Sequence, residues 1–266
     1  MDSSALMLST PELLAVVRGR LSTIARNTGR FGDAVDLARQ AVAHAAGLPE
    51  HAPARLQAAF ILIAALSVKG DLDEAWEVAM ALDISESVPA VPSLLVARGA
   101  WAIGNVAFRR GEIEIGMQQH ALTARLLLPQ ADLEAWSEFH RASAVLKMQA
   151  GIVDESVRHS VSNAERGTGI LARAEQIAEV AIAKAYLALL TDDLASAGTL
   201  LQSVDGQRDL LDFESTTDLE YCLGKYFAAR RAPEQAAYHL RKAARLYSEA
   251  GAEERALELM EQMRAL

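Results

Sequence analysis

The sequence is poor in residues that several common classes of protein need. It has one cysteine, Cys222, among 266 residues, and aromatic residues make up only 5% of the chain. A single cysteine excludes an intrachain disulfide and the structural zinc sites that need two or more thiolates. This usage favours a cytoplasmic location. Cys222 falls within a helical segment, where we expect it to be an inert core residue.

Long hydrophobic runs are also absent. The most apolar stretch, AAFILIAAL at 58–66, is far shorter than the roughly 20 residues that cross a bilayer. Near the N-terminus, Asp2 stands where a secretory signal has basic residues, and Ser9, Thr10 and Pro11 interrupt the apolar residues. We therefore expect a cytoplasmic protein without membrane association.

Positive charge is in deficit. Lys and Arg number 26 against 35 Asp and Glu, which gives a formal net charge of −9. Binding to nucleic acids relies on clustered cations that neutralise phosphates. The sequence therefore predicts no direct nucleic-acid binding by this chain. Its 51% content of hydrophobic residues is sufficient for a large folded core.

The motifs of catalytic, cofactor and metal sites are missing. The sequence has no His-Glu-x-x-His, no GxSxG and no cysteine pair. Its six histidines show no i,i+3 or i,i+4 pairing, so only a site assembled from distant segments could bind a metal. RGTGIL at 166–171 lacks a full phosphate-binding fingerprint, and we expect a loop there. The sequence predicts that the protein is not an enzyme and has no cofactor.

A turn residue followed five positions later by a small residue recurs along the chain. Successive turn residues are 41, 41, 40, 41, 39 and 20 residues apart. A fixed period in this range is typical of stacked supersecondary units. The turn residues are Gly29, Gly70, Gly111, Gly151, Asp192, Arg231 and Gly251.

Each repeat has the pattern of a helix, a tight turn and a second helix. ARLQAAFILIAALSVKG and DLDEAWEVAMAL around Gly70 are rich in helix-forming residues. Glycine suits the turn because it adopts positive φ at little cost. The position seven residues before the turn should be small where the two helices cross, and five of its six residues are small: Ser22, Ile63, Gly104, Ala144, Ala185 and Gly224.

These spacings resemble the tetratricopeptide repeat (TPR) family over nearly the whole chain. The resemblance implies an all-α fold, a right-handed superhelical solenoid of about six TPR-like hairpins that forms one domain over 1–266. The segment 252–265 would be a C-terminal capping helix. The period near 40 exceeds the family's 34 or so, so longer helices or connections would take up the difference. An irregular helical bundle is the alternative, but it gives no reason for a fixed period.

The resemblance also implies a concave groove, lined by the first helix of each hairpin, that binds a short peptide or a protein partner. The family's ligand-facing positions fall in this chain on Arg98, Trp101, Asn105, Phe108, Arg109, Glu138, Arg141, Tyr186, Tyr221 and Lys225. They also include Val145, Met148, Gln149, Glu179, Ile182 and Asp218. The arginines would suit a peptide with a free C-terminus or acidic residues. Alternatively, the arginines are ordinary solvated charges, and the two large aromatic residues on the third repeat pack between hairpins.

The run that begins WAIGNVAFRRGEIEIG, at 101–151, resembles the C-terminal repeat region of bacterial transcription regulators with an N-terminal Xre-type helix-turn-helix. That resemblance implies a sensor domain that binds a peptide and forms a homodimer. We expect no helix-turn-helix within the chain, because only about 28 residues precede the first turn. It is therefore either the sensor part of a regulator or a stand-alone scaffold that holds a folded protein partner.

Overall fold

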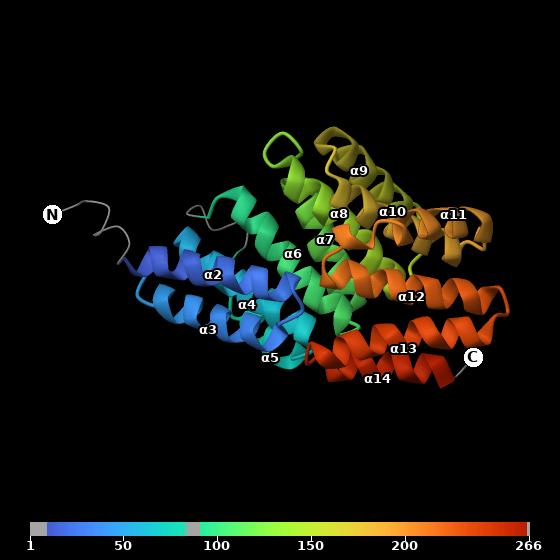
Figure 1. The fold of residues 1–266 in the computed structure, drawn as a ribbon. Helices are drawn as coiled ribbons and strands as arrows, with labels where there is room; N and C mark the ends of the chain where they lie inside the picture. The colour runs from blue at the N-terminus through green and yellow to red at the C-terminus, as the bar shows by residue number, and fades with distance from the viewer. Residues whose placement is uncertain (1–9, 83, 85–90, 265–266) are drawn as a thin grey trace. The chain divides into compact units, whose positions relative to one another are not determined.

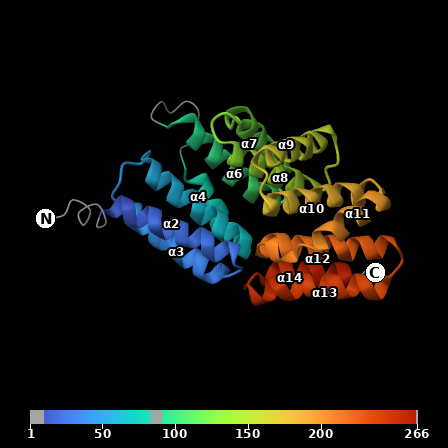
Figure 2. The ribbon, with the colours of Figure 1, turned by 45° about the horizontal axis from the view of Figure 1, so that its top comes forward.

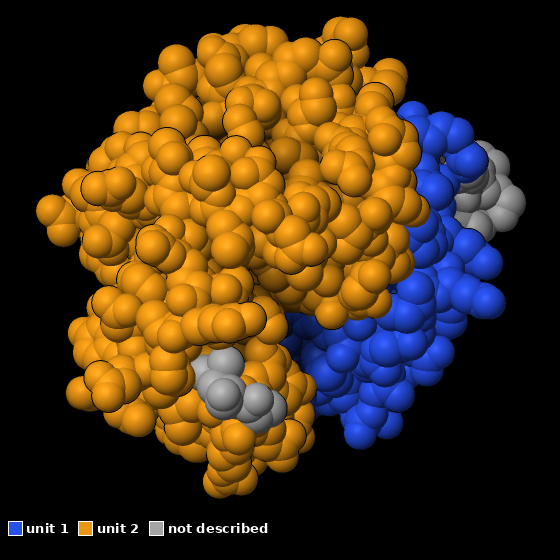
Figure 3. Space-filling view, turned by 90° about the vertical axis from the view of Figure 1, so that its right-hand side faces the viewer, with its two compact units in different colours: residues 1–127 blue, residues 128–266 orange. Residues whose placement is uncertain are grey.

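The computed structural model describes residues 10–82, 84 and 91–264. Thirteen α-helices and one short 3-10 helix, η1, make up this part of the chain, and it contains no strand (Figure 1). The predicted all-α fold is confirmed. The chain divides into two compact units, 1–127 and 128–266, which Figure 3 shows in different colours. Among the described helices, none is both long enough and apolar enough to span a bilayer.

Unit 1 consists of three helical hairpins joined by tight turns. They pair α2 (Pro11–Asn27) with α3 (Phe31–Ala45), α4 (Pro53–Lys69) with α5 (Leu72–Met80), and α6 (Ser93–Arg109) with α7 (Ile113–Leu126). The first helices pack in order, α2 on α4 and α4 on α6, as in stacked repeats. Figures 1 and 2 both show α2 running alongside α3 and α4.

Unit 2 repeats this plan and ends with an additional helix. Its hairpins pair α8 (Leu133–Gln149) with α9 (Glu155–Leu171), α10 (Ala174–Leu190) with α11 (Leu194–Asp205), and α12 (Phe213–Ala229) with α13 (Pro233–Glu249). The short η1 (Arg208–Leu210) precedes α12, and α14 (Glu253–Arg264) packs against α13 (Figure 2). The predicted capping helix is confirmed, although residue 265 lies outside the described residues.

The seven predicted turn residues all adopt the left-handed backbone conformation. The five glycines have φ between 74° and 106°, whereas φ is 59° at Asp192 and 57° at Arg231. At the α4–α5 turn, the amide of Gly70 donates to the carbonyl of Leu66 at 3.0 Å, which closes the end of the first helix. The period read from the sequence therefore marks helix ends even where glycine is absent.

The small residues near each turn lie where the two helices of a hairpin cross. In the first hairpin, Ser22 Oγ donates to the carbonyl of Ala34 at 2.7 Å. In the last, a Cβ added to Gly224 would lie 2.7 Å from Leu240 Cγ, closer than real Cβ atoms approach. A side chain at this position would therefore push α12 and α13 apart. Ile63, the one larger residue in the series, is fully buried.

Both the helices and the connections between hairpins contribute to the long period. The first helix of every hairpin contains 17 residues, from α2 through α12. This confirms the expectation of longer helices or connections. The long helices also give each hairpin a long contact surface, because an α-helix rises about 1.5 Å per residue.

The prediction of a loop at 166–171 is wrong, because this segment forms the last turns of α9. The helix ends at Leu171, and Ala172 follows in the left-handed conformation with φ of 52°. Gly167 lies inside the helix because α9 packs closely on α8 there. A Cβ added to Gly167 would lie 2.8 Å from Ser137 Cβ.

Candidate functional site

In unit 1, the predicted groove residues lie on α6, and two of them connect α6 to its neighbours. Asn105 Oδ1 lies 3.1 Å from His120 Nε2 of α7. Arg109 Nη1 donates to the carbonyl of Ser67 on α4 at 3.1 Å. Both side chains are half-buried. Arg109 thus joins two hairpins, and Asn105 connects the two helices of one hairpin.

Phe108 is a core residue of the α6–α7 hairpin. Its side chain is only 6% exposed, and its ring centroid lies 4.9 Å from that of His120 in an edge-to-face arrangement. It also packs on Gly116, where an added Cβ would lie 2.9 Å from the ring. Arg98 and Trp101 are half-buried on α6, and both already interact with other residues of the protein.

In unit 2, three consecutive first helices bring charged side chains together. Arg141 Nε on α8 lies 3.2 Å from Glu179 Oε2 on α10. Glu214 and Asp218 on α12 act electrostatically on the same guanidinium, as does the exposed Glu138 on α8. We call these five residues the Arg141 cluster. It contains four carboxylates around one arginine.

Negative charge dominates the Arg141 cluster. Burial by itself lowers the pKa of Arg141, but the carboxylates, Glu179 first, outweigh this effect and raise the pKa above its usual value. The pKa of Glu179 is raised, mainly because the side chain is buried. The charge of Arg141 lowers this pKa, whereas the charges of Asp212 and other carboxylates raise it further. The Arg141 cluster therefore carries more negative than positive charge, whereas we expected its arginine to suit an acidic peptide.

Two tyrosines and a lysine adjoin the Arg141 cluster. The ring centroids of Tyr186 on α10 and Tyr221 on α12 lie 5.7 Å apart, edge to face. Burial raises the pKa of both phenols, and the charge of Asp218 adds to both shifts. Lys225 Nζ lies 5.9 Å from the centroid of the Tyr221 ring, and Lys225 is exposed. Tyr186 is buried and supports Tyr221, which is half-buried.

Two charged residues of this region, Glu214 and Arg255, were not predicted from the sequence. Arg255 of α14 lies with its Cζ 4.1 Å from the centroid of the Tyr247 ring. Burial by itself lowers the pKa of Arg255, but Tyr247, Glu214 and Asp218 outweigh it and raise the pKa. A signal for Glu214 was present, because Glu214, Asp218, Tyr221 and Lys225 recur at helical spacing.

The remaining positions that the family resemblance assigns to the groove lie partly in the core and partly on the surface. Met148 and Ile182 are buried, Val145 is half-buried and Gln149 is exposed. Cys222 is buried, and burial raises the pKa of its thiol well above the usual value, which keeps it protonated. Within the described residues, no three His, Cys, Asp or Glu side chains are grouped so that they could hold a metal ion.

The hairpin architecture is similar to that of proteins of known structure. A Rap protein complexed with competence and sporulation factor matches with a TM-score of 0.69 and 13% identity, covering 93% of this chain and 66% of that one. A tetratricopeptide repeat protein from Parabacteroides merdae matches at a TM-score of 0.42 and 14% identity, over 94% and 98% of the two chains. No family model and no curated protein sequence matches. The likeness to the Rap structure, with the paired hairpins, shows that this chain has a TPR-like helical-repeat fold.

Proposed function

We propose that this chain binds a short peptide, or an extended segment of a protein partner, on the surface that carries the Arg141 cluster. The observation that supports this proposal is the convergence of charged and aromatic side chains from α8, α10 and α12. A structure with a similar fold is that of a Rap protein complexed with competence and sporulation factor, which is consistent with such a role.

The chemistry of the surface favours a basic ligand. The cluster and Lys225 together carry four carboxylates and two cations, so their formal net charge is −2. Exposed Glu138 and the carboxylates of α12 suit Lys or Arg side chains of the ligand. Tyr221 offers apolar area with a polar end, which suits the stem of a long basic side chain. A basic peptide therefore replaces the acidic peptide that the sequence analysis favoured.

The biological setting that we propose is regulatory. The resemblance of 101–151 to sensor regions of Xre-type regulators suggests that ligand binding on this chain modulates a bacterial transcription regulator. The motif-poor sequence agrees with a binding role. If the ligand is a folded protein instead of a short peptide, the same surface would make the chain a scaffold.

Fluorescence anisotropy with labelled peptide pools of defined charge tests the binding proposal. We expect the Lys- and Arg-rich pool to bind saturably, and acidic pools to bind much more weakly. Glu138→Gln should weaken binding several-fold, because it removes an exposed carboxylate of the cluster. Glu155→Gln, at an exposed carboxylate on α9, is the matched control and should bind normally.

Three results would contradict the proposal. These are binding of no pool, preference for acidic peptides, and equal binding by Glu138→Gln and the unsubstituted protein. Capture of one folded partner that competes with the basic pool would favour the scaffold. Capture of short peptides alone would favour the sensor.

A further inference from the structure

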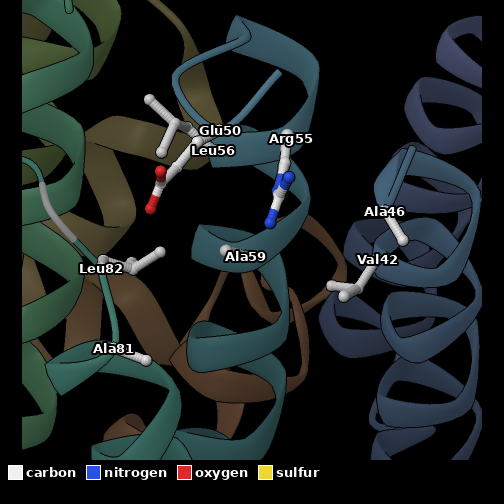
Figure 4. Close-up of a pocket in the computed structure, with 8 residues that line it drawn as sticks. All are labelled: Val42, Ala46, Glu50, Arg55, Leu56, Ala59, Ala81 and Leu82. Carbon is white, nitrogen blue, oxygen red and sulfur yellow. The ribbon is translucent and has the colours of Figure 1, made fainter. Parts of the chain in front are cut away.

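Unit 1 contains a small pocket where the ends of α3, α4 and α5 meet. Its volume is about 170 Å³. Six of its eight lining residues are apolar, and the other two carry opposite charges: Val42, Ala46, Glu50, Arg55, Leu56, Ala59, Ala81 and Leu82 (Figure 4). A pocket of this size is smaller than the roughly 300–1,000 Å³ that holds drug-sized ligands. It can therefore hold only a very small molecule.

Arg55 provides a positive group that is fixed in place and still available. Its Nη1 donates to the carbonyl of Leu48 at 2.9 Å, which uses one of the five donors of a guanidinium. Figure 4 shows the guanidinium extending along α4 toward the level of Ala59. Arg55 has no ion-pair partner in the described part of the chain. The remaining donors can therefore bind a carboxylate through two parallel hydrogen bonds.

Glu50 provides a negative group at the rim of the same pocket. It lies in the connection between α3 and α4, and it is exposed. Its carboxylate extends into the space beside α4 (Figure 4). No ion pair joins Glu50 to Arg55. A simple anion would be attracted by Arg55 and repelled by Glu50, whereas a ligand with both charges would satisfy both groups.

We propose that this pocket binds a free aliphatic α-amino acid such as leucine. The ligand's carboxylate lies on Arg55 and its ammonium group faces Glu50. Its side chain occupies the apolar part of the pocket, against Val42, Leu56 and Leu82. The combination of apolar walls with a few convergent polar groups is typical of small-molecule sites. This site is independent of the proposed peptide surface, because it lies entirely within unit 1.

Methyl NMR titration of the full chain with L-leucine tests this proposal. We expect saturable shifts of the Val42, Leu56 and Leu82 methyl signals, with a dissociation constant on the order of 1 mM. Leucinamide lacks the carboxylate and 4-methylpentanoate lacks the ammonium group. Each should bind about tenfold more weakly, which corresponds to the loss of one charge-assisted contact.

Two substitutions test the two charged groups of the pocket separately. Arg55→Met keeps an apolar stem and should weaken leucine binding by about tenfold or more. Arg20→Met, at an exposed arginine on α2, is the matched control and should bind normally. Glu50→Gln should raise the affinity for 4-methylpentanoate toward that for leucine, a gain that misfolding cannot produce.

The proposal is overturned if millimolar leucine causes no saturable shift of these methyl signals. It also fails if leucinamide binds as tightly as leucine, or if Arg55→Met binds leucine like the unsubstituted protein. Loss of fold in Arg55→Met would show in its circular dichroism spectrum. Glu50→Gln would then test the site, because Glu50 is exposed in a connection and its substitution should not unfold the protein. Unchanged binding of 4-methylpentanoate by this variant would contradict the proposal.

Discussion

Unit 1 and unit 2 share the hairpin plan but differ in their interiors. In unit 1, the described buried polar residues are Ser22, Ser67, His120 and Thr123. Unit 2 buries more polar groups, and these include the charged residues Lys147 and Glu220. The repeat pattern therefore determines where helices cross, while the chemistry inside each hairpin differs between the two units. We expect the two units to respond differently to loss of charge, loss of apolar volume and acid.

A second charge network in unit 2 is centred on Glu220 of α12, whose side chain is 0% exposed. Its carboxylate lies 2.7 Å from Lys242 Nζ and 2.7 Å from His239 Nδ1, and it also pairs with Arg208. Burial by itself raises the pKa of Glu220, but the hydrogen bonds, that of His239 first, outweigh it and hold the pKa below its usual value.

Glu220→Gln is expected to have the largest effect on stability. It removes the charge that pairs with Lys242 and Arg208 and the carboxylate that contacts His239, which should lower the free energy of unfolding of unit 2 by about 3–5 kcal/mol. Hydrogen exchange followed by mass spectrometry would measure each unit separately. Unit 1 should keep its protection. Glu249→Gln, in an exposed pair with Arg245, should change stability by less than about 1 kcal/mol.

The same network should have a defined pH dependence. Because the pKa of Glu220 is lowered in the folded protein, its stabilisation is present above the unfolded-state pKa. It is lost as the pH falls through the folded-state pKa. Glu220→Gln should remove this part of the acid sensitivity. An unchanged acid profile in the variant would show that Glu220 does not contribute to it.

Leu66→Ala is the corresponding test in unit 1. Leu66 is fully buried in its apolar core, so the substitution should lower the free energy of unfolding by roughly 2–5 kcal/mol. Urea denaturation at several pH values would measure this effect, which should not vary with pH because no titrating group is removed. Leu257→Ala, at an exposed leucine of α14, should change stability by less than about 0.5 kcal/mol. An equal loss of stability in unit 2 would show that the two units do not unfold independently.

His140 should make unit 2 sensitive to acid. It is buried beside Asn163, whose Nδ2 lies 3.2 Å from His140 Nε2, while His140 Nδ1 has no hydrogen-bond partner among the described residues. Burial first, then the charge of His159, lowers its pKa from 6.5 to about 4. Stability should therefore fall as the pH drops from the unfolded-state pKa to the folded-state value, by up to about 3 kcal/mol.

NMR titration of the imidazole signal of His140 would measure this shift directly. His140→Phe keeps a ring next to Trp136 and Phe139 and removes the titrating group. It should flatten the fall in stability between the two pKa values. A midpoint for His140 near 6.5 would show that burial does not suppress its protonation.

Substitutions at the turn residues should change the stability of the protein least. Gly70→Ala places a side chain at φ of 106° and should cost about 1–2 kcal/mol. Asp192→Gly removes the backbone strain of a non-glycine residue at φ of 59° and should stabilise the protein by up to about 1 kcal/mol. Thermal unfolding would measure both. Gly169→Ala, in a helix with open space around it, should raise the melting temperature, so a fall there would undermine the assignment of strain to the turns.

The turns and helices could be predicted from the sequence because they depend on local features. The period alone identified Asp192 and Arg231 as turn residues, although neither is glycine. The prediction of a loop at 166–171 was wrong because Gly167 serves a tertiary contact and not a turn. Its small size permits the contact with Ser137 on α8, and a pattern read along one segment does not contain that contact.

The candidate site could be predicted only in part. The repeat register placed Arg141 on a first helix, but its partner Glu179 is 38 residues away, and only the packing of α8 on α10 joins them. Phe108 was assigned to the groove from the register, whereas the rotation of α6 places it against Gly116. The excess of carboxylates around Arg141 could not be predicted from the register alone, because they come from three different helices.

The contacts between helices have a consequence for how the chain folds. Each principal contact joins elements that are adjacent or next but one in the chain. Such a pattern has low contact order, which favours fast formation of the individual hairpins. Each hairpin can therefore pack against the preceding hairpin as the chain is synthesised. The N-terminal hairpins can be in place on the ribosome before the last helix has been translated.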